Sequence, residues 1–252
     1  MTPVPGASIG SWLAQRELTL PLAETFGPTP QGEGPHTGRP AVFIRFGHCN
    51  LSCSWCDTPY TWDTSRYDLD RECPDTSVET IATNAMSRGA KLFILTGGEP
   101  MMHQRKPAMH VLLSRLRGAG EIHVETNGTI PPIPAFAEHI THFTVSPKLA
   151  NTGADPLRRR INHRALKTFT DLANSRRACF KFVAMRPEDV DEVYALTVDY
   201  DIPTDAVWIM PEGVTAANVI RTHRDLIDHI LARGFNTTTR LHTLLWEQER
   251  AR

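Results

Sequence analysis

The residues best suited to chemistry in this 252-residue chain are three cysteines, Cys49, Cys53 and Cys56, at the spacing C-x3-C-x2-C. Thiolates at such short intervals on one loop can converge on a single inorganic centre, as they do in iron–sulfur proteins. A cluster of four irons normally takes four thiolates, so three thiolates leave one iron open, as in catalytic metal sites. A small molecule with a free amine and a carboxylate could chelate that iron.

A zinc site is the alternative reading of the cysteines. Tetrahedral zinc takes four ligands, often as two pairs, and no second C-x2-C or H-x3-H pair follows in the sequence. His48 directly precedes Cys49, but adjacent residues point apart in an extended loop. Disulfides are disfavoured because the spacing is too tight for separate bridges and no secretory signal is present. We interpret the isolated Cys73 and Cys179 as thiols without a role.

Composition is that of a globular protein, with 40% hydrophobic and 22% charged residues. The net charge of −1 provides no basic footprint for nucleic acid or for an anionic membrane. No apolar run approaches the roughly 18 residues that cross a bilayer. We therefore expect a cytoplasmic protein without nucleic-acid or membrane partners. It should consist of an N-terminal extension, residues 1–20, and a single domain, residues 21–252.

Alternating strands and helices are expected to position the cysteines. Apolar runs predict strands over residues 41–45, 91–96, 121–125, 142–146, 178–183, 206–210 and 240–245. Helical periodicity predicts helices over residues 78–87, with Ser77 as N-cap, and over 106–117, 162–173, 188–199 and 216–233. The proline-rich segment 133–139 predicts one abbreviated crossover. Such alternation indicates an α/β fold, a partial or complete (β/α) barrel with mostly parallel strands.

Two other segments carry signals of irregular structure. Residues 24–35 contain three glycines and three prolines and predict a tight loop around Gln31 and Glu33. The charged residues between Trp62 and Pro74 predict a solvated insert.

Polar residues follow four consecutive predicted strands. The motifs are Thr96-Gly-Gly-Glu-Pro100, Glu125-Thr-Asn-Gly128, Ser146-Pro-Lys148 and Met210-Pro-Glu-Gly213. Each could be an ordinary turn, but the carboxyl ends of parallel strands share one edge, where such folds bind ligands. Together with the cysteines they predict the functional site. Arg45 ends the strand before the cysteines, where it could bind a carboxylate or form a surface salt bridge.

These motifs, with Gln31-Gly-Glu-Gly34 and the Cys-Asp-Thr that begins at Cys56, resemble the 7-carboxy-7-deazaguanine synthase family of the radical S-adenosylmethionine (SAM) superfamily. The resemblance implies a partial (β/α) barrel of the radical SAM type and a homodimer. It also implies ring contraction of 6-carboxy-5,6,7,8-tetrahydropterin to 7-carboxy-7-deazaguanine with loss of ammonia, in queuosine or deazapurine biosynthesis. The implied partners are the pterin and an electron donor such as flavodoxin or ferredoxin.

The resemblance also assigns roles to individual residues. A 4Fe–4S cluster would be held by Cys49, Cys53 and Cys56, and Mg2+ by Thr58. SAM would be contacted by Trp55, Cys56, Asp57, Gly98, Glu125, Ser146, Pro147 and Lys148. The substrate would be contacted by Pro30, Gln31, Gly32, Arg45 and Thr96. No side chain is expected to act as a conventional nucleophile, because the cofactors carry the chemistry.

The chain departs from the family pattern at Pro30, where an apolar β-branched residue is more usual. The tail after His242 is longer and more charged than in members whose C-terminus reaches the substrate, so no C-terminal substrate contact is inferred. The alternatives are a glycyl-radical activase of the same superfamily and a non-catalytic metal-binding or electron-transfer module. A third is an α/β-barrel enzyme whose cysteines hold a zinc ion.

Overall fold

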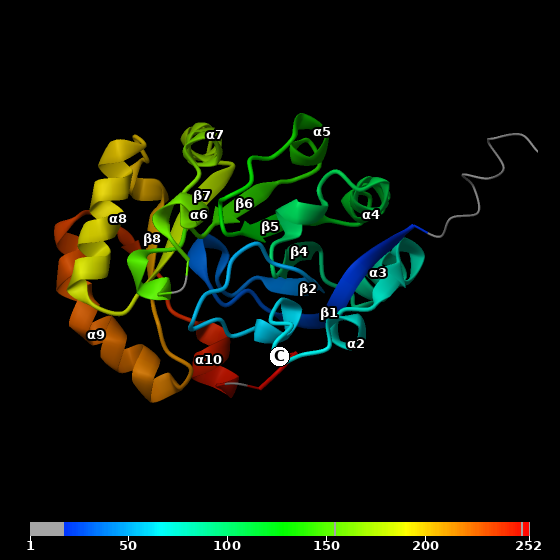
Figure 1. The fold of residues 1–252 in the computed structure, drawn as a ribbon, viewed down its shortest axis with the longest axis horizontal. Coiled ribbons are helices and arrows are strands. Elements are labelled where there is room, and N and C mark those ends of the chain that lie inside the picture. The colour runs from blue at the N-terminus through cyan, green and yellow to red at the C-terminus, as the bar shows by residue number, and fades with distance from the viewer. Residues whose placement is uncertain (1–17, 154, 248, 252) are drawn as a thin grey trace, which may run out of the picture.

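The computed structural model describes residues 18–153, 155–247 and 249–251, whose strands form one open sheet in the order β3-β1-β2-β4-β5-β6-β7-β8-β9. The strands are β1 (Thr19–Pro30), β2 (Pro40–Phe46), β3 (Asp75–Ser77), β4 (Leu92–Gly97), β5 (Glu121–Thr126), β6 (His142–Val145), β7 (Ala178–Ala184), β8 (Val207–Pro211) and β9 (Asn236–Thr237). The pairs from β2 to β9 are parallel, whereas β1 runs antiparallel to β2 and β3. The expected partial barrel with mostly parallel strands is confirmed (Figure 1).

The longer helices cover the outer face of this sheet (Figure 1). The helices are α2 (Leu69–Glu72), α3 (Val78–Ser87), α4 (Pro107–Arg117), α5 (Pro134–Ala137), α6 (Leu157–Arg160), α7 (His163–Asn174), α8 (Pro187–Asp199), α9 (Ala216–Ala232) and α10 (Leu241–Trp246). Short 3-10 turns are η1 (Gly34–His36), η2 (Pro59–Thr61), η3 (Pro100–His103), η4 (Ala150–Thr152) and η5 (Thr204–Ala206).

Local sequence accounts for where these helices begin. The side chain of Ser77 accepts a hydrogen bond from the backbone N–H of Thr80, which confirms Ser77 as the N-cap of α3. Asn162 and Thr215 cap α7 and α9 in the same way. Proline occupies the first helical position of α4, α5 and α8, where its missing N–H costs nothing. All seven residues of β7 are buried, as expected for a parallel strand covered on both faces.

Two predicted elements are wrong. Residues 24–30 belong to strand β1 rather than to a loop, because the backbone from Leu22 to Pro30 pairs with β2. The Gly27-Pro28 step is accommodated by a register irregularity between Phe26 and Thr29. The predicted strand 240–245 is helix α10, and the last strand is the short β9, which pairs with β8. A six-residue apolar run has the same appearance in a strand and in a helix.

The predicted insert between Trp62 and Pro74 also contains regular structure, the helix α2, and the strand β3, which pairs with β1, follows it directly. Of the expected N-terminal extension, residues 1–17 lie outside the described residues, and β1 begins at Thr19. The abbreviated crossover is confirmed as the four-residue helix α5.

Three imidazole rings pack together at the amino ends of β5 and β6. His36 of η1 packs against His123 and His142, with ring centroids 4.5 Å and 4.6 Å apart. Burial lowers the pKa of His123 to about 4 and that of His142 to about 3. The buried imidazoles of His123 and His142 thus pack at the end of the sheet opposite to the edge that carries the cysteines.

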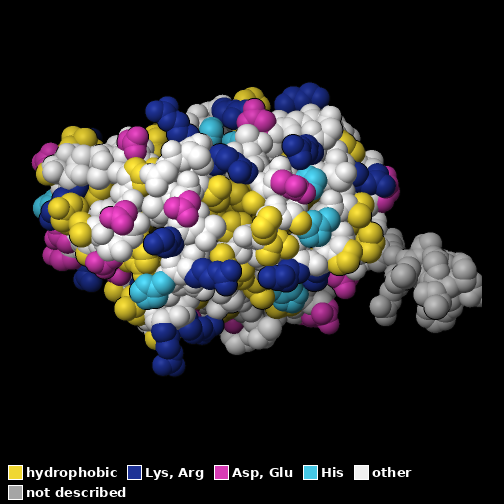
Figure 2. Space-filling model, turned by 90° about the horizontal axis from the view of Figure 1, so that it is seen from above, with side chains coloured by type: hydrophobic (Ala, Val, Ile, Leu, Met, Phe, Trp, Pro, Cys, Tyr) yellow, Lys and Arg dark blue, Asp and Glu magenta, His cyan; other side chains and the backbone are white. Residues whose placement is uncertain are grey.

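Neither the helices nor the charged side chains indicate a membrane-spanning segment or a concentrated basic patch in the part of the protein described below. No helix within the described ranges is long and apolar enough to cross a bilayer. On the face shown in Figure 2, Lys and Arg side chains are scattered among acidic and hydrophobic ones rather than gathered in one patch.

Candidate active site

The cysteine-bearing loop, residues 47–62, follows β2 at the carboxyl edge of the parallel strands. Cys49, Cys53 and Cys56 are free thiols that line one cavity. The same cavity is lined by the ends of β4, β5 and β6, through residues 96–98, 125–127, 146 and 148. Three of the four predicted polar motifs are thus brought to the cysteines.

The surroundings of Cys49 and Cys53 disfavour their thiolate forms. Burial raises the pKa of Cys49 to about 12 and also raises the pKa of Cys53. Metal ligation requires thiolates, so iron binding would release these protons. Within the described ranges, no three His, Cys, Asp or Glu side chains are grouped as ligands of a single metal ion. A four-iron cluster takes one thiolate per iron, which separated thiols on one cavity can supply.

Hydrogen-bond donors are aimed at the sulfurs. The indole Nε1 of Trp62 lies 3.3 Å from Cys56 Sγ, and the backbone N of Leu51 lies 3.5 Å from Cys49 Sγ. Such donors favour the negative charge that thiolates and cluster sulfides carry. The residues present therefore fit an iron–sulfur cluster.

Gly97 and Gly98 allow the end of β4 to lie against the cysteine loop. A Cβ atom on Gly98 would approach the carbonyl O of His48 to 2.0 Å, and one on Gly97, where φ is +135°, would approach that of Phe46 to 2.2 Å. Glycine is therefore required at both positions. The next residue, Glu99, is fully buried and accepts hydrogen bonds from Met101 N, Asn127 N and the Thr126 hydroxyl.

Glu125, at the end of β5, connects the two sides of the site. Its Oε2 accepts a hydrogen bond from the Thr96 hydroxyl at 2.8 Å and its Oε1 accepts one from Gln31 Nε2 at 3.0 Å. Thr96 lines the cysteine cavity, whereas Gln31 reaches it through Glu125. A residue expected to contact SAM is therefore held by two residues expected to contact the substrate.

The other residues expected to contact SAM lie around the same cavity. Lys148 donates to the Ser146 hydroxyl at 3.0 Å, and its ammonium lies 5.6 Å from the Trp55 ring centroid. Pro147, between Ser146 and Lys148 in the sequence, is buried and is not among the residues that line the cavity. Asp57 lines the cavity with its side chain 54% exposed and pairs with Arg240.

Arg45 is engaged in an ion pair beside the cavity rather than in its lining. Its ε nitrogen donates to Glu24 at 2.8 Å. The same carboxylate accepts the Tyr60 hydroxyl at 2.9 Å and Arg250 Nε at 3.0 Å. Sequence analysis left a salt bridge and a ligand contact open for Arg45, and the ion pair, which uses only the ε nitrogen, is compatible with both.

Thr58, the residue expected to bind Mg2+, is buried in the cavity wall just before η2. Its hydroxyl lies 3.7 Å from Cys56 Sγ. Mg2+ prefers oxygen ligands and keeps several waters, so one hydroxyl at this position is compatible with a partial coordination shell.

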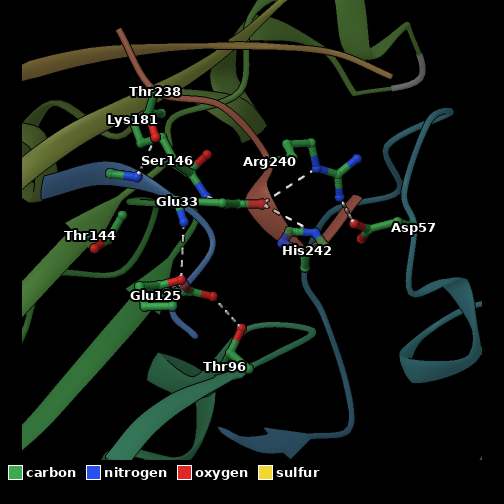
Figure 3. Close-up of polar contacts among 12 residues, drawn as sticks. Glu33, Asp57, Thr96, Glu125, Thr144, Ser146, Lys181, Thr238, Arg240 and His242 are labelled. Carbon is green, nitrogen blue, oxygen red and sulfur yellow. Dashed lines mark hydrogen bonds and ion pairs between the residues drawn. The ribbon is translucent and has the colours of Figure 1, made fainter. Parts of the chain in front are cut away.

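An ion network beside the cavity was missed by sequence analysis (Figure 3). Glu33 pairs with Lys181 of β7 and lies near Arg240 Nε at 3.4 Å and His242 Nε2 at 3.8 Å. Arg240 also pairs with Asp57, so the network joins the loop after β1 to the cysteine loop. Although burial opposes its ionisation, Lys181 and Arg240 hold the pKa of Glu33 well below its usual range.

The C-terminal segment therefore reaches the region assigned to the substrate, although no such contact was inferred from the sequence. Leu241 N donates to Gly32 O at 2.9 Å, and a Cβ atom on Gly32 would approach His242 Nδ1 to 2.3 Å. Pro30, at the end of β1, pairs with Pro40 of β2 and delivers the chain to this contact. A lysine inside the otherwise apolar run 178–184 was the available sequence signal for Lys181.

Comparisons with known proteins agree with this geometry. A family model described as "Radical SAM superfamily" matches residues 43–212. The 7-carboxy-7-deazaguanine synthase of Pyrobaculum aerophilum is 34% identical over 224 residues, which cover 88% of this chain and 93% of that protein. The 7-carboxy-7-deazaguanine synthase of Halobacterium salinarum is 34% identical over 253 residues, covering 90% of each. The crystal structure of QueE from Escherichia coli superimposes with a TM-score of 0.63 at 25% identity, covering 94% of this chain and 100% of that one.

Proposed function

This chain belongs to the 7-carboxy-7-deazaguanine synthase family of the radical SAM superfamily, and we propose on that premise that it converts 6-carboxy-5,6,7,8-tetrahydropterin to 7-carboxy-7-deazaguanine with loss of ammonia. The observation that carries the proposal is that three free thiols and the polar ends of β4, β5 and β6 line one cavity. When bound there, a 4Fe–4S cluster and SAM supply a carbon-centred radical that removes a hydrogen atom from the substrate.

The cysteine side of the cavity is proposed to hold the cofactors. Cys49, Cys53 and Cys56 would ligate three irons, and SAM would lie beside Gly98, whose missing Cβ lets the end of β4 lie against the cysteine loop. Trp55, Asp57, Glu125, Ser146, Pro147 and Lys148 would lie around it. The carboxylate of Glu125 is held in place by Gln31 and Thr96, so it is preorganised before SAM arrives.

The substrate is proposed to bind between the loop after β1 and the end of β4. A buried pterin carboxylate must be paired, and Arg45 with Mg2+ held at Thr58 would supply the positive charge. Gln31, Gly32 and Thr96 would contact the ring, with Pro30 at the edge. We add Lys181 to the proposed contacts, because it lines the cavity and its ammonium is neutralised by Glu33.

A one-electron donor such as flavodoxin or ferredoxin would reduce the cluster, and the enzyme would act as a homodimer in the cytoplasm. The free cysteines at positions 49, 53, 56, 73 and 179 support a reducing compartment. No observation on the described residues favours a glycyl-radical activase or an electron carrier as a second function.

The radical SAM assignment is tested by cleavage of SAM. Protein reconstituted anaerobically with iron and sulfide should convert SAM to 5′-deoxyadenosine when dithionite is added, and Cys53→Ala should not. An electron carrier would accept the electron without cleaving SAM. Colourless protein that holds stoichiometric zinc would contradict the assignment.

A further inference from the structure

Trp62 makes a specific contact with one of the three cluster cysteines. Its indole Nε1 donates to Cys56 Sγ at 3.3 Å, and the ring lines the cysteine cavity. An indole has one N–H and no acceptor, so its direction fixes which atom it serves. Here that atom is a sulfur expected to ligate iron.

The fold holds this contact in place. Trp62 ends the short turn η2, with its backbone N donating to Pro59 O at 3.1 Å. The preceding Thr61 is fully buried, and its hydroxyl donates to Thr58 O at 2.8 Å. Its carbonyl accepts the His48 N–H at 2.7 Å. The turn thus folds the chain back so that residue 62 meets residue 56.

The contact also distinguishes Cys56 from Cys49, whose contacts are longer. The nearest donors to Cys49 Sγ are Leu51 N at 3.5 Å and Asn127 Nδ2 at 4.0 Å. The second tryptophan of the loop, Trp55, provides a contrast, because in the described structure its Nε1 is buried without a hydrogen-bond partner.

We propose that the Trp62 N–H raises the reduction potential of the cluster by stabilising negative charge on Cys56. Reduction adds one electron to a centre whose charge is shared with its thiolate ligands, so a donor to a ligand sulfur stabilises the reduced form more than the oxidised form. The electron comes from an external one-electron donor, a reduced flavin or iron–sulfur protein. The proposal rests on the cluster assigned above. Trp62 would act on the cluster only through the Cys56 sulfur, so it is a positioning residue rather than a catalytic one.

The test is a redox titration of the cluster without SAM, in which electron paramagnetic resonance measures the amount of reduced cluster at each potential. Trp62→Phe keeps an aromatic ring but removes the donor, and should shift the reduction equilibrium about tenfold toward the oxidised cluster, a decrease of about 59 mV for one electron. Trp208→Phe, which removes an indole N–H on β8 outside the lining of the cysteine cavity, should leave the potential unchanged. Iron and sulfide content, measured in parallel, shows whether each variant carries a complete cluster.

A second measurement covers the case in which Trp62→Phe does not assemble the cluster. The unmodified chain is labelled with 15N-tryptophan, and pulsed electron paramagnetic resonance of the reduced cluster should detect one indole 15N that persists in Trp55→Phe. Absence of that coupling, or an unshifted potential in fully loaded Trp62→Phe, would overturn the proposal and leave the enzymatic assignment intact. Failure of the unmodified chain to assemble any cluster would overturn both.

Discussion

The carboxylate of Glu24 accepts the Nε–H of Arg45 at 2.8 Å across the antiparallel pair β1 and β2. The contact occupies the ε nitrogen and orients the guanidinium, whose η nitrogens form the fork that matches a carboxylate. Tyr60 and Arg250 donate to the same carboxylate. Glu24 therefore connects β2, the cysteine loop and the C-terminal tail.

We expect Glu24→Gln to raise the KM for the carboxypterin about tenfold, ~1.4 kcal/mol, because the charged partner that orients Arg45 is lost. The SAM concentration needed for half-maximal rate should change little. The matched control is Glu121→Gln, which breaks the exposed Arg39–Glu121 ion pair at the opposite end of the sheet. Equal KM values for Glu24→Gln and the parent would show that Glu24 does not position Arg45.

The Glu33 network predicts a pH-dependent contribution to stability. The pKa of Glu33 is held below its usual value near 4.5, so the unfolded chain takes up a proton at a pH where the folded chain does not. The contribution is fully present above the unfolded pKa and is lost as the pH falls below it.

Glu33→Gln should therefore lower the free energy of unfolding by about 3–5 kcal/mol near pH 7, because Lys181 is left buried without its partner. Denaturant titrations should give the same difference at pH 7.5 and 5.5 and a smaller one below pH 4.5. A difference that is constant down to pH 4 would reject the ionised network.

The packed imidazoles of His36, His123 and His142 predict that acid destabilises the fold. His142, with its pKa lowered to about 3, faces His36 and His123 and lies 3.4 Å from Cys179 Sγ. The unfolded chain protonates this imidazole below about pH 6.5, whereas the folded chain does not, so stability falls as the pH decreases from 6.5.

Replacement of His142 by Gln should reduce the slope of unfolding free energy against pH between 6 and 4 by up to ~1.4 kcal/mol per pH unit, the value for one proton. The exposed His229 on α9 provides the control variant His229→Gln. Identical slopes in His142→Gln and the parent would mean that His142 is already charged in the fold.

Thr58 is tested through the dependence of turnover on Mg2+. Thr58→Ala should raise the Mg2+ concentration for half-maximal turnover several-fold, since one oxygen ligand is lost, while cluster content stays the same. Thr58→Ser keeps the hydroxyl and should retain most of the Mg2+ response. Superimposable Mg2+ titrations for all three proteins would count against metal binding at this position.

The sequence predicts the sheet well because buried parallel strands are continuous apolar runs. The strands around residues 92–97, 121–126 and 178–184 are readable for this reason. It fails where local signals conflict with long-range pairing. Gly27 and Pro28 indicate a loop, yet pairing with β2 draws them into β1. The run 240–245 is too short for its periodicity to separate strand from helix.

The cysteine site was predictable because its ligands are close in sequence and its strand ends share one edge. The ion network was not, since Glu33 and Lys181 are 148 positions apart and no local pattern links the two segments. Arg240 and His242 were hidden in a predicted strand that is in fact a helix and its preceding residue. Contacts of this kind form only when the whole chain has folded and brings distant segments together.

The most direct measurement is a mass analysis of the reaction mixture. Reconstituted protein, SAM, Mg2+, dithionite and 6-carboxy-5,6,7,8-tetrahydropterin are incubated anaerobically, with Cys53→Ala in parallel. The parent protein should form 7-carboxy-7-deazaguanine and release one ammonia per product, and the variant should form neither. A fully loaded cluster that cleaves SAM yet leaves the carboxypterin unchanged would contradict the proposed reaction.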